Sequence, residues 1–71
     1  MPEEIRAHIT GVVFQIPTKA GDKVAAGDAV IVLESMKMEI PVTAPCAGTV
    51  KELRVAPEDV VQEGDVVAIL D

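Results

Sequence analysis

Residues 34–39, which read ESMKME, place Lys37 between two methionines and within a pair of glutamates. Three explanations account for a lysine in this setting. Both methionines could be core residues beside a solvated lysine, the segment could be a recognition epitope, or Lys37 could be a residue that another protein finds and modifies. Methionine is adaptable and is common on surfaces that other proteins bind, which favours the last two explanations.

Few other residues of the chain could take part in catalysis or hold a metal. The chain has one serine, one histidine and one cysteine, which are Ser35, His8 and Cys46. A Ser-His-Asp or Cys-His arrangement would have to use these single residues, although they lie far apart in the sequence. A zinc site needs several histidine or cysteine ligands, and the sequence has no glycine-rich phosphate loop. We therefore expect no catalytic residues and no metal site, which leaves Lys37 as the chemically conspicuous residue.

Charge and composition exclude several classes of function. The formal net charge is −6 and Phe14 is the only aromatic residue, so the chain repels phosphate backbones and offers little for stacking bases. We expect no binding to nucleic acid. No apolar run approaches the ~20 residues that span a membrane, and the acidic N-terminus lacks an apolar signal sequence. A single cysteine forms no internal disulfide and fits a reducing compartment, so we expect a cytoplasmic protein without membrane contact.

The chain contains an internal repeat. Residues 11–34 align with residues 48–71 without a gap, at an offset of 37 positions. The match continues backward through Ile5/Val42 and Ala7/Ala44, so the two copies occupy residues 5–34 and 42–71. The identical positions in the aligned segments are Gly11/Gly48, Val13/Val50, Asp22/Asp59, Val24/Val61, Gly27/Gly64, Asp28/Asp65, Val30/Val67 and Leu33/Leu70.

Each copy has the pattern of short strands separated by turns. Both copies contain a Gly-Asp turn followed by a β-branched run that is too short for a helix. Gly11 and Gly48 predict bends or bulges at equivalent places, and scattered prolines leave little room for a long helix. Neither copy can bury its apolar face alone, so the two should pack together. We predict one all-β domain over residues 1–71, a sandwich or flattened barrel with quasi-two-fold symmetry.

Residues 35–41 connect the two copies and must contain a turn between two strands. From Met36 onward, apolar and polar residues alternate with the period of a strand, so Lys37 should lie at or beside a hairpin tip. Tight hairpins prefer Asn-Gly, Asp-Gly or Gly-X, whereas this one offers Ser-Met-Lys-Met, which indicates that a partner has shaped the turn. The connector of a two-fold repeat lies at one end of the molecule. This place weakens the alternative that both methionines are core residues.

The segment ESMKMEIPVTAPCAGTV, together with EGDVVAIL near the C-terminus, closely resembles the biotinyl domain of biotin-dependent carboxylases. The resemblance runs from Ala7 to Leu70 and implies a flattened barrel of two four-stranded antiparallel sheets, of the type without a protruding thumb. The usual core motif of that family is Ala-Met-Lys-Met, whose lysine carries biotin as an amide, and this position is Lys37 here. The residues that the resemblance assigns to recognition by the ligase and other partners are Glu34, Ser35, Met36, Met38 and Glu39.

Two positions depart from the family pattern. Ser35 stands where alanine is usual, which is a change between small residues. Glu58 stands where the first copy has Gly21 and where the family often has glycine, so we expect this turn to differ between the copies.

The resemblance also implies a mechanism in which the chain is a carrier and not a catalyst. A biotin protein ligase uses ATP to join biotin to Lys37. A biotin carboxylase then supplies a carboxyl group, and a carboxyltransferase passes it to an acyl-CoA or a 2-oxo acid. Two alternatives remain open. One is a lipoyl carrier, although lipoyl domains typically show Asp-Lys-Ala, and the other is an unmodified barrel that serves as an interaction module.

Overall fold

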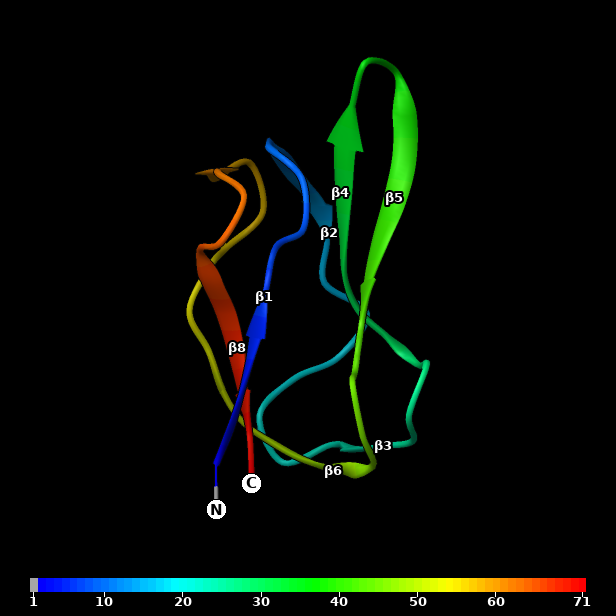
Figure 1. Ribbon diagram of the computed structural model, residues 1–71, viewed down its shortest axis with the longest axis vertical. Coiled ribbons are helices and arrows are strands. Elements are labelled where there is room, and N and C mark those ends of the chain that lie inside the picture. The colour runs from blue at the N-terminus through cyan, green and yellow to red at the C-terminus, as the bar shows by residue number, and fades with distance from the viewer. Residues whose placement is uncertain (1) are drawn as a thin grey trace.

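The computed structural model describes residues 2–71 as eight strands in two antiparallel sheets of four strands each. The strands are β1 (Glu3–Arg6), β2 (Gly11–Gln15), β3 (Lys23–Val24), β4 (Ala29–Ser35), β5 (Met38–Thr43), β6 (Gly48–Leu53), β7 (Val60–Val61) and β8 (Val66–Leu70). One sheet has the order β1-β8-β6-β3 and the other has the order β5-β4-β2-β7. The molecule measures 33 × 17 × 17 Å, with the two termini side by side at one end (Figure 1). The prediction of an all-β fold with two four-stranded sheets is confirmed.

The core lies between the sheets and consists of aliphatic side chains. β-branched residues dominate it because they pack well on a pleated surface. Among the described residues, no buried side chain is polar or charged. Within residues 2–71 the structure has no helix that could span a membrane. The largest fully buried side chains are Ile31, Leu33, Leu70, Val13, Val30, Val42, Val50 and Val67.

The two sheets are related by the offset of 37 positions that relates the sequence copies. Strands β1 to β4 correspond to β5 to β8, and exchanging the two sets converts one sheet order into the other. The irregularities of register also repeat. One interrupts β2 between Val13 and Gln15, and its counterpart interrupts β6 between Val50 and Glu52. The predicted quasi-two-fold symmetry is therefore confirmed.

Backbone hydrogen bonds between the copies occur in symmetric pairs. The Gly21 N–H donates to the Val50 carbonyl at 2.7 Å, and its counterpart, the Glu58 N–H, donates to the Val13 carbonyl at 2.8 Å. Three further pairs join a backbone N–H of one copy to a backbone carbonyl of the other. The first pair is Val50 N–H to the Asp22 carbonyl and Val13 N–H to the Asp59 carbonyl. The other two pairs are Gly27 N–H to Ala44 and Gly64 N–H to Ala7, and Ala44 N–H to Asp28 and Ala7 N–H to Asp65. Each copy therefore satisfies backbone groups of the other, which would otherwise be left without partners inside the protein.

Four turns at equivalent places are closed by aspartates. The carboxylates of Asp22, Asp28, Asp59 and Asp65 each accept a hydrogen bond from the backbone N–H three residues earlier, at distances of 2.8 to 3.0 Å. An aspartate in this role takes up an N–H that no strand partner reaches, and it fixes the path of the turn. The Gly-Asp turns expected from the sequence are those at Asp28 and Asp65.

Glu58 adopts the backbone conformation of the glycine at the equivalent position. Its φ is +77°, against +98° at Gly21, and both residues donate their N–H to the opposite copy. The expectation that these two turns differ is wrong, because the same hydrogen bonds fix the same geometry in each copy. Left-handed backbone costs an L-residue roughly 1–2 kcal/mol, a cost that Glu58 bears and Gly21 avoids.

Gly11 and Gly48 are required by a close approach of backbone and not by a bend. They begin strands β2 and β6. A Cβ atom would lie 2.8 Å from the carbonyl oxygen of Glu34 at the first glycine and 3.0 Å from that of Asp71 at the second. The irregularities expected at these glycines lie farther along the same strands, starting at Val13 in β2.

The Glu58→Gly variant should be more stable than the parent chain. Glycine removes left-handed strain of about 1–2 kcal/mol and adds about 0.5–1 kcal/mol of backbone entropy in the unfolded state, so the net gain should be about 0.5–1 kcal/mol. Urea denaturation measures this gain as a higher midpoint. The mirror variant Gly21→Glu should lose a similar amount, because no atom within 4 Å would contact its Cβ and strain is the only change there. A lower midpoint for Glu58→Gly would contradict this account.

Candidate functional site

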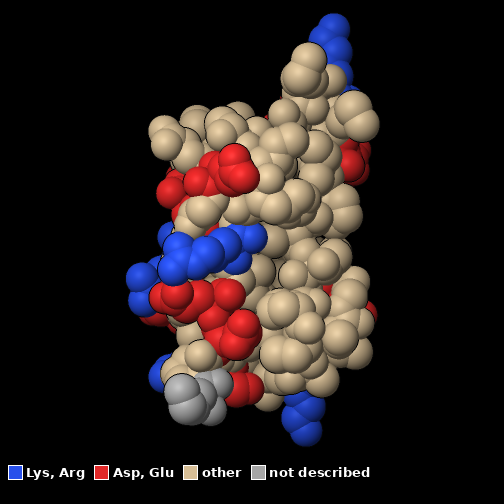
Figure 2. All heavy atoms as spheres, viewed as in Figure 1, with Lys and Arg blue, Asp and Glu red and all other residues tan. Residues whose placement is uncertain are grey.

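Lys37 lies in a two-residue turn at the end of the hairpin formed by β4 and β5. The last paired residues are Ser35 and Met38, so only Met36 and Lys37 remain in the loop. Figure 1 shows the hairpin projecting beyond the other strands, at the end opposite both termini. A basic side chain ends this projection in Figure 2, and Lys37 is the only lysine or arginine of residues 29–43. The structure therefore places Lys37 at the hairpin tip, as the sequence indicated.

Both residues of the turn have left-handed backbone. The φ angle is +53° at Met36 and +67° at Lys37. Positive φ at both central positions is typical of a type I′ turn, whose twist matches that of the strands but which normally uses asparagine and glycine. Two residues with Cβ atoms cost about 1–2 kcal/mol each in this region. The strands hold the turn in place, because Leu33 is 0% exposed and Val42 is 2% exposed.

The two methionines lie on the surface. Met36 is 91% exposed and Met38 is 63% exposed, so the alternative that both are core residues is wrong. Exposure falls along one face of β5, from Met38 through the half-buried Ile40 to the buried Val42. The alternation read from the sequence is correct, but its outer end extends past the core. The tip thus presents two exposed, flexible apolar side chains, those of the residues directly before and after Lys37 in the sequence.

Exposure alone does not single out Lys37, because Lys19, Lys23 and Lys51 are exposed as well. Lys23 and Lys51 lie within strands β3 and β6. Lys19 lies in a closed turn, where its backbone N–H donates to the Asp22 carboxylate at 3.0 Å. Of these four lysines, Lys37 occupies the projecting turn. Within residues 2–71 its side chain takes part in no salt bridge, so the amine is open to an incoming protein.

Glu34 and Glu39 face each other across the hairpin, one rung below Ser35 and Met38. Both glutamate side chains are exposed, while Ser35 is half-buried. Like charges directly opposite each other on neighbouring strands are destabilising. The pair therefore weakens the hairpin slightly and creates a negative site below the turn, which suits a cationic side chain of a partner.

The structure gathers all the residues assigned to recognition in the turn and the two rungs below it. Sequence reasoning missed that the two glutamates are cross-strand partners. The signal was present, because a two-residue turn at Met36 and Lys37 makes Ser35 the partner of Met38, and the next rung then joins Glu34 to Glu39.

The other candidate residues considered for catalysis lie outside the hairpin. His8 follows β1 and Cys46 follows β5, and both are exposed. In the part of the chain that the structure describes, no group of three or more histidine, cysteine, aspartate or glutamate side chains is arranged to hold a metal ion.

Known proteins resemble this chain in both sequence and fold. A profile of the family described as "Biotin-requiring enzyme" matches residues 1–70. The "Biotinylated protein TB7.3 homolog" of Mycobacterium leprae is 44% identical over 70 residues, which cover 99% of each chain. The mitochondrial propionyl-CoA carboxylase alpha chain of Homo sapiens is 40% identical over 67 residues, which cover 94% of this chain and 9% of that one.

The same fold occurs in a solved structure of a much longer protein. The crystal structure of the Kluyveromyces lactis urea carboxylase superposes with a TM-score of 0.95 and 35% identity, over 100% of this chain and 6% of that one. The chain therefore spans a small part of such carboxylases and nearly the whole length of the mycobacterial relative. It belongs to the family of biotin-requiring enzymes, as a biotinyl domain homologous to the carrier domains of carboxylases.

Proposed function

We propose that this chain acts as one carrier domain of a biotin-dependent carboxylase, with biotin in amide linkage to Lys37. The observation that carries the proposal is the position of Lys37 in an exposed, left-handed turn at the far end of a projecting hairpin. Membership of the biotinyl family gives independent support. In this proposal the chain supplies no catalytic group of its own.

The tip fits the chemistry of attachment. Amide formation requires the Nζ of Lys37 to lose a proton and to attack an activated carboxyl carbon, from which the activating group departs. Lysine side chains in water are protonated near neutral pH. Residues 29–43 contain no histidine that could accept the proton. The proton therefore passes to a base of the ligase or to water, and this chain contributes an accessible amine.

The hairpin also suits a group that must be carried without being consumed. When attached, biotin supplies a ureido nitrogen that takes up and releases a carboxyl group. In residues 29–43 only Ser35 and Thr43 carry hydroxyl groups, and none carries a thiol or an imidazole. The hairpin therefore offers little that could attack or protonate a labile carboxyl group. The buried base of β4 and β5 fixes the position of the tip, while the Lys37 side chain adds flexible reach.

The residues around Lys37 are proposed to be read by three partners, the biotin protein ligase, the biotin carboxylase and the carboxyltransferase. Met36 and Met38 offer exposed apolar surface that adapts to a pocket. The facing carboxylates of Glu34 and Glu39 offer a site for a lysine or arginine of the partner. Association with such a partner would relieve the repulsion between the two carboxylates.

We propose that the carboxyl group passes to an acyl-CoA or a 2-oxo acid. The similarity to a propionyl-CoA carboxylase chain supports an acyl-CoA as one such acceptor. We place the chain in the cytoplasm, because its single cysteine forms no internal disulfide and fits a reducing compartment.

Co-expression with a biotin protein ligase should add one biotinyl group to the chain. Tryptic mapping should find it on Lys37 and not on Lys19, Lys23 or Lys51, because only Lys37 lies in the projecting turn. Lys37→Arg keeps the charge but presents a guanidinium that does not form the amide, so modification should disappear. Its free energy of unfolding should change by no more than about 0.5 kcal/mol, as is usual for an exposed side chain. Biotin on another lysine, or a lipoyl group in its place, would overturn the proposal.

Met36→Asn should separate stability from recognition. Asparagine accepts left-handed backbone more readily than methionine, and Met36, at 91% exposed, loses no core contact. We expect the free energy of unfolding to rise by roughly 0.5 kcal/mol, while biotinylation slows several-fold because an apolar contact with the ligase is lost. Urea denaturation and a ligase time course measure the two effects.

Met38→Ala provides the companion measurement. Met38 is 63% exposed, so its loss should cost clearly less than the ~2–5 kcal/mol of a core methionine. Normal biotinylation rates in both methionine variants would show that neither side chain is a ligase contact.

A further inference from the structure

The quasi-two-fold symmetry allows each outward-facing residue of one sheet to be compared with its equivalent on the other. Inward-facing residues match, as Val13 and Val50 do. Of five outward-facing residues, all but Val32 differ in kind from their equivalents. On the sheet that carries the hairpin they form a group that we call the apolar face, made of Val12, Phe14, Val32, Pro41 and Val60. The equivalents on the other sheet, in the same order, are Thr49, Lys51, Ile69, Glu4 and Lys23.

The apolar face draws residues from all four strands of its sheet and contains two pairs in register. Val60 of β7 is the partner of Val12 of β2, and Val32 of β4 is the partner of Pro41 of β5. The two pairs are offset from each other across β2 and β4, where Val12 is the partner of Glu34 and Val32 is the partner of Gln15. Phe14 lies on β2 next to the irregularity of register. The exposed fractions are 71% at Val60, 47% at Phe14 and 40% at Val12. Single exposed apolar residues are ordinary, but two apolar pairs in register on the outer side of one sheet, with the exposed Phe14 on the same strand as Val12, favour a contact surface.

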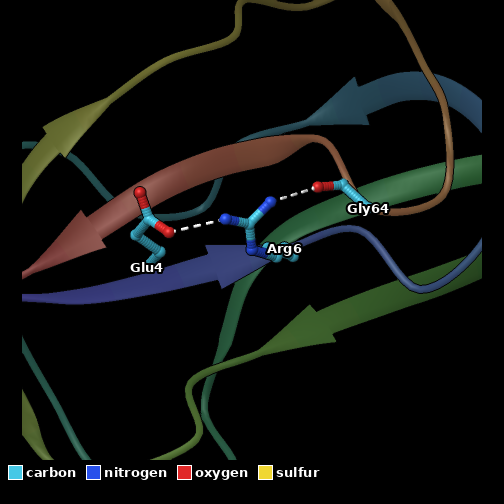
Figure 3. A network of polar contacts seen from close by, with 3 residues as sticks. All are labelled: Glu4, Arg6 and Gly64. Carbon is cyan, nitrogen blue, oxygen red and sulfur yellow. Dashed lines mark hydrogen bonds and ion pairs between the residues drawn. The ribbon is translucent and has the colours of Figure 1, made fainter.

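The equivalent face of the other sheet is covered by charged side chains of both signs. Glu4 and Glu52 flank Ile69 in register, and Ile69 is only 7% exposed. Figure 3 shows the Arg6 guanidinium donating to the Glu4 carboxylate at 2.7 Å and to the Gly64 carbonyl at 2.7 Å. In Figure 2 the charged side chains gather over β1 and β8, and fewer lie over β4 and β5. This charged face is suited to remain exposed to solvent.

Val32 has no such cover. Its partners in register are Gln15 and Pro41, where the equivalent Ile69 has two glutamates. Long charged side chains lie with their stems along apolar surface and keep their heads in water, so they can hide an apolar neighbour. Val32 lacks such neighbours and stays half-buried. The chain thus covers Ile69 with its own charged side chains and leaves the equivalent Val32 without such cover.

We infer that the apolar face docks on the biotin carboxylase component, through a patch on that partner that is apolar at its centre and basic at its border. This inference rests on the proposed function. The border of the apolar face on this chain is acidic, since Glu34 is the partner of Val12 and Glu58 and Asp59 precede Val60. A component that binds ATP must hold its phosphate groups, which favours basic side chains near that site. Such a surface complements this chain, whose net charge is −6.

A second copy of the chain fits the apolar face less well. A two-fold dimer joins the same patch of both copies, so the acidic border of one would lie against that of the other. Like-charge juxtaposition is unfavourable, and each copy carries a net charge of −6.

The apolar face and the tip belong to one sheet. Glu34 and Glu39 lie between the turn and the rung that joins Val32 to Pro41. A partner seated on the apolar face therefore lies on the sheet from which Lys37 projects, while the charged face stays in water. The apolar face supplies affinity and the tip supplies the reacting group.

The test measures binding of the purified biotin carboxylase component from the same organism to the biotinylated chain, by titration calorimetry. Biotin on Lys37 is verified by mass before each titration. The variant Phe14→Lys/Val60→Lys installs the residues that the symmetric positions carry, and it should raise Kd at least about ten-fold. The uncharged variant Phe14→Ser/Val60→Thr should raise Kd several-fold, which separates lost apolar contact from added charge. The KM for the carrier in carboxylation should rise in parallel, with kcat unchanged.

The matched control is Glu4→Gln/Glu52→Gln, which adds the same charge to the opposite face and should change Kd less than about two-fold. All variants alter exposed positions, and urea midpoints confirm that they fold. An unchanged Kd in both apolar-face variants overturns the inference. A wild-type dimer that these variants dissociate overturns it in favour of a self-interface, and slower biotinylation with normal carboxylase binding overturns it in favour of the ligase. Failure of wild-type biotinylation on Lys37 would instead refute the proposed function.

Discussion

The backbone hydrogen bonds exchanged between the two copies are the constraint on which the rest of the structure depends. Each copy closes its turns with its own aspartates, yet the N–H and carbonyl groups of those turns bind the opposite copy, as Gly21 does with Val50 and Glu58 with Val13. Neither set of four strands could satisfy its backbone alone. The exchange adds to an apolar core that contains no aromatic side chain.

This shared base allows one hairpin to carry strain. The turn at Met36 and Lys37 uses left-handed backbone without glycine, and the glutamates below it repel each other. Both features lower the stability of the tip, and both are placed where no core contact depends on them. Strain of this kind persists only where the surrounding structure determines the conformation, and it concentrates at functional sites. The hairpin thus trades local stability for an exposed lysine in a fixed position.

Much of the fold and the site could be predicted from sequence because the repeat is gapless. The offset of 37 positions predicted the two-fold symmetry, and the connector between the copies predicted the place of Lys37. The irregularities of register could not be predicted, because simple alternation does not show where a strand slips by one residue. Val30 and Ile31 are both buried, and Phe14 and Gln15 are both exposed, beside such irregularities. The apolar face was therefore hidden until the partners across the strands were known. The left-handed Glu58 was hidden for another reason, since its conformation is imposed by the opposite copy.

The position of both termini at the end opposite the hairpin affects how far Lys37 can travel. Any segment joined at either terminus would be attached at the end of the molecule opposite Lys37, and the molecule is 33 Å long. A small rotation at that base moves the tip along an arc whose radius is close to this length. A flexible Gly/Ser-rich linker needs roughly 35 residues to reach an average span of the same size, since its extent grows only with the square root of its length. Rotation of the folded domain about its base would therefore displace the tip without the entropy that a disordered tether of equal reach would lose on docking.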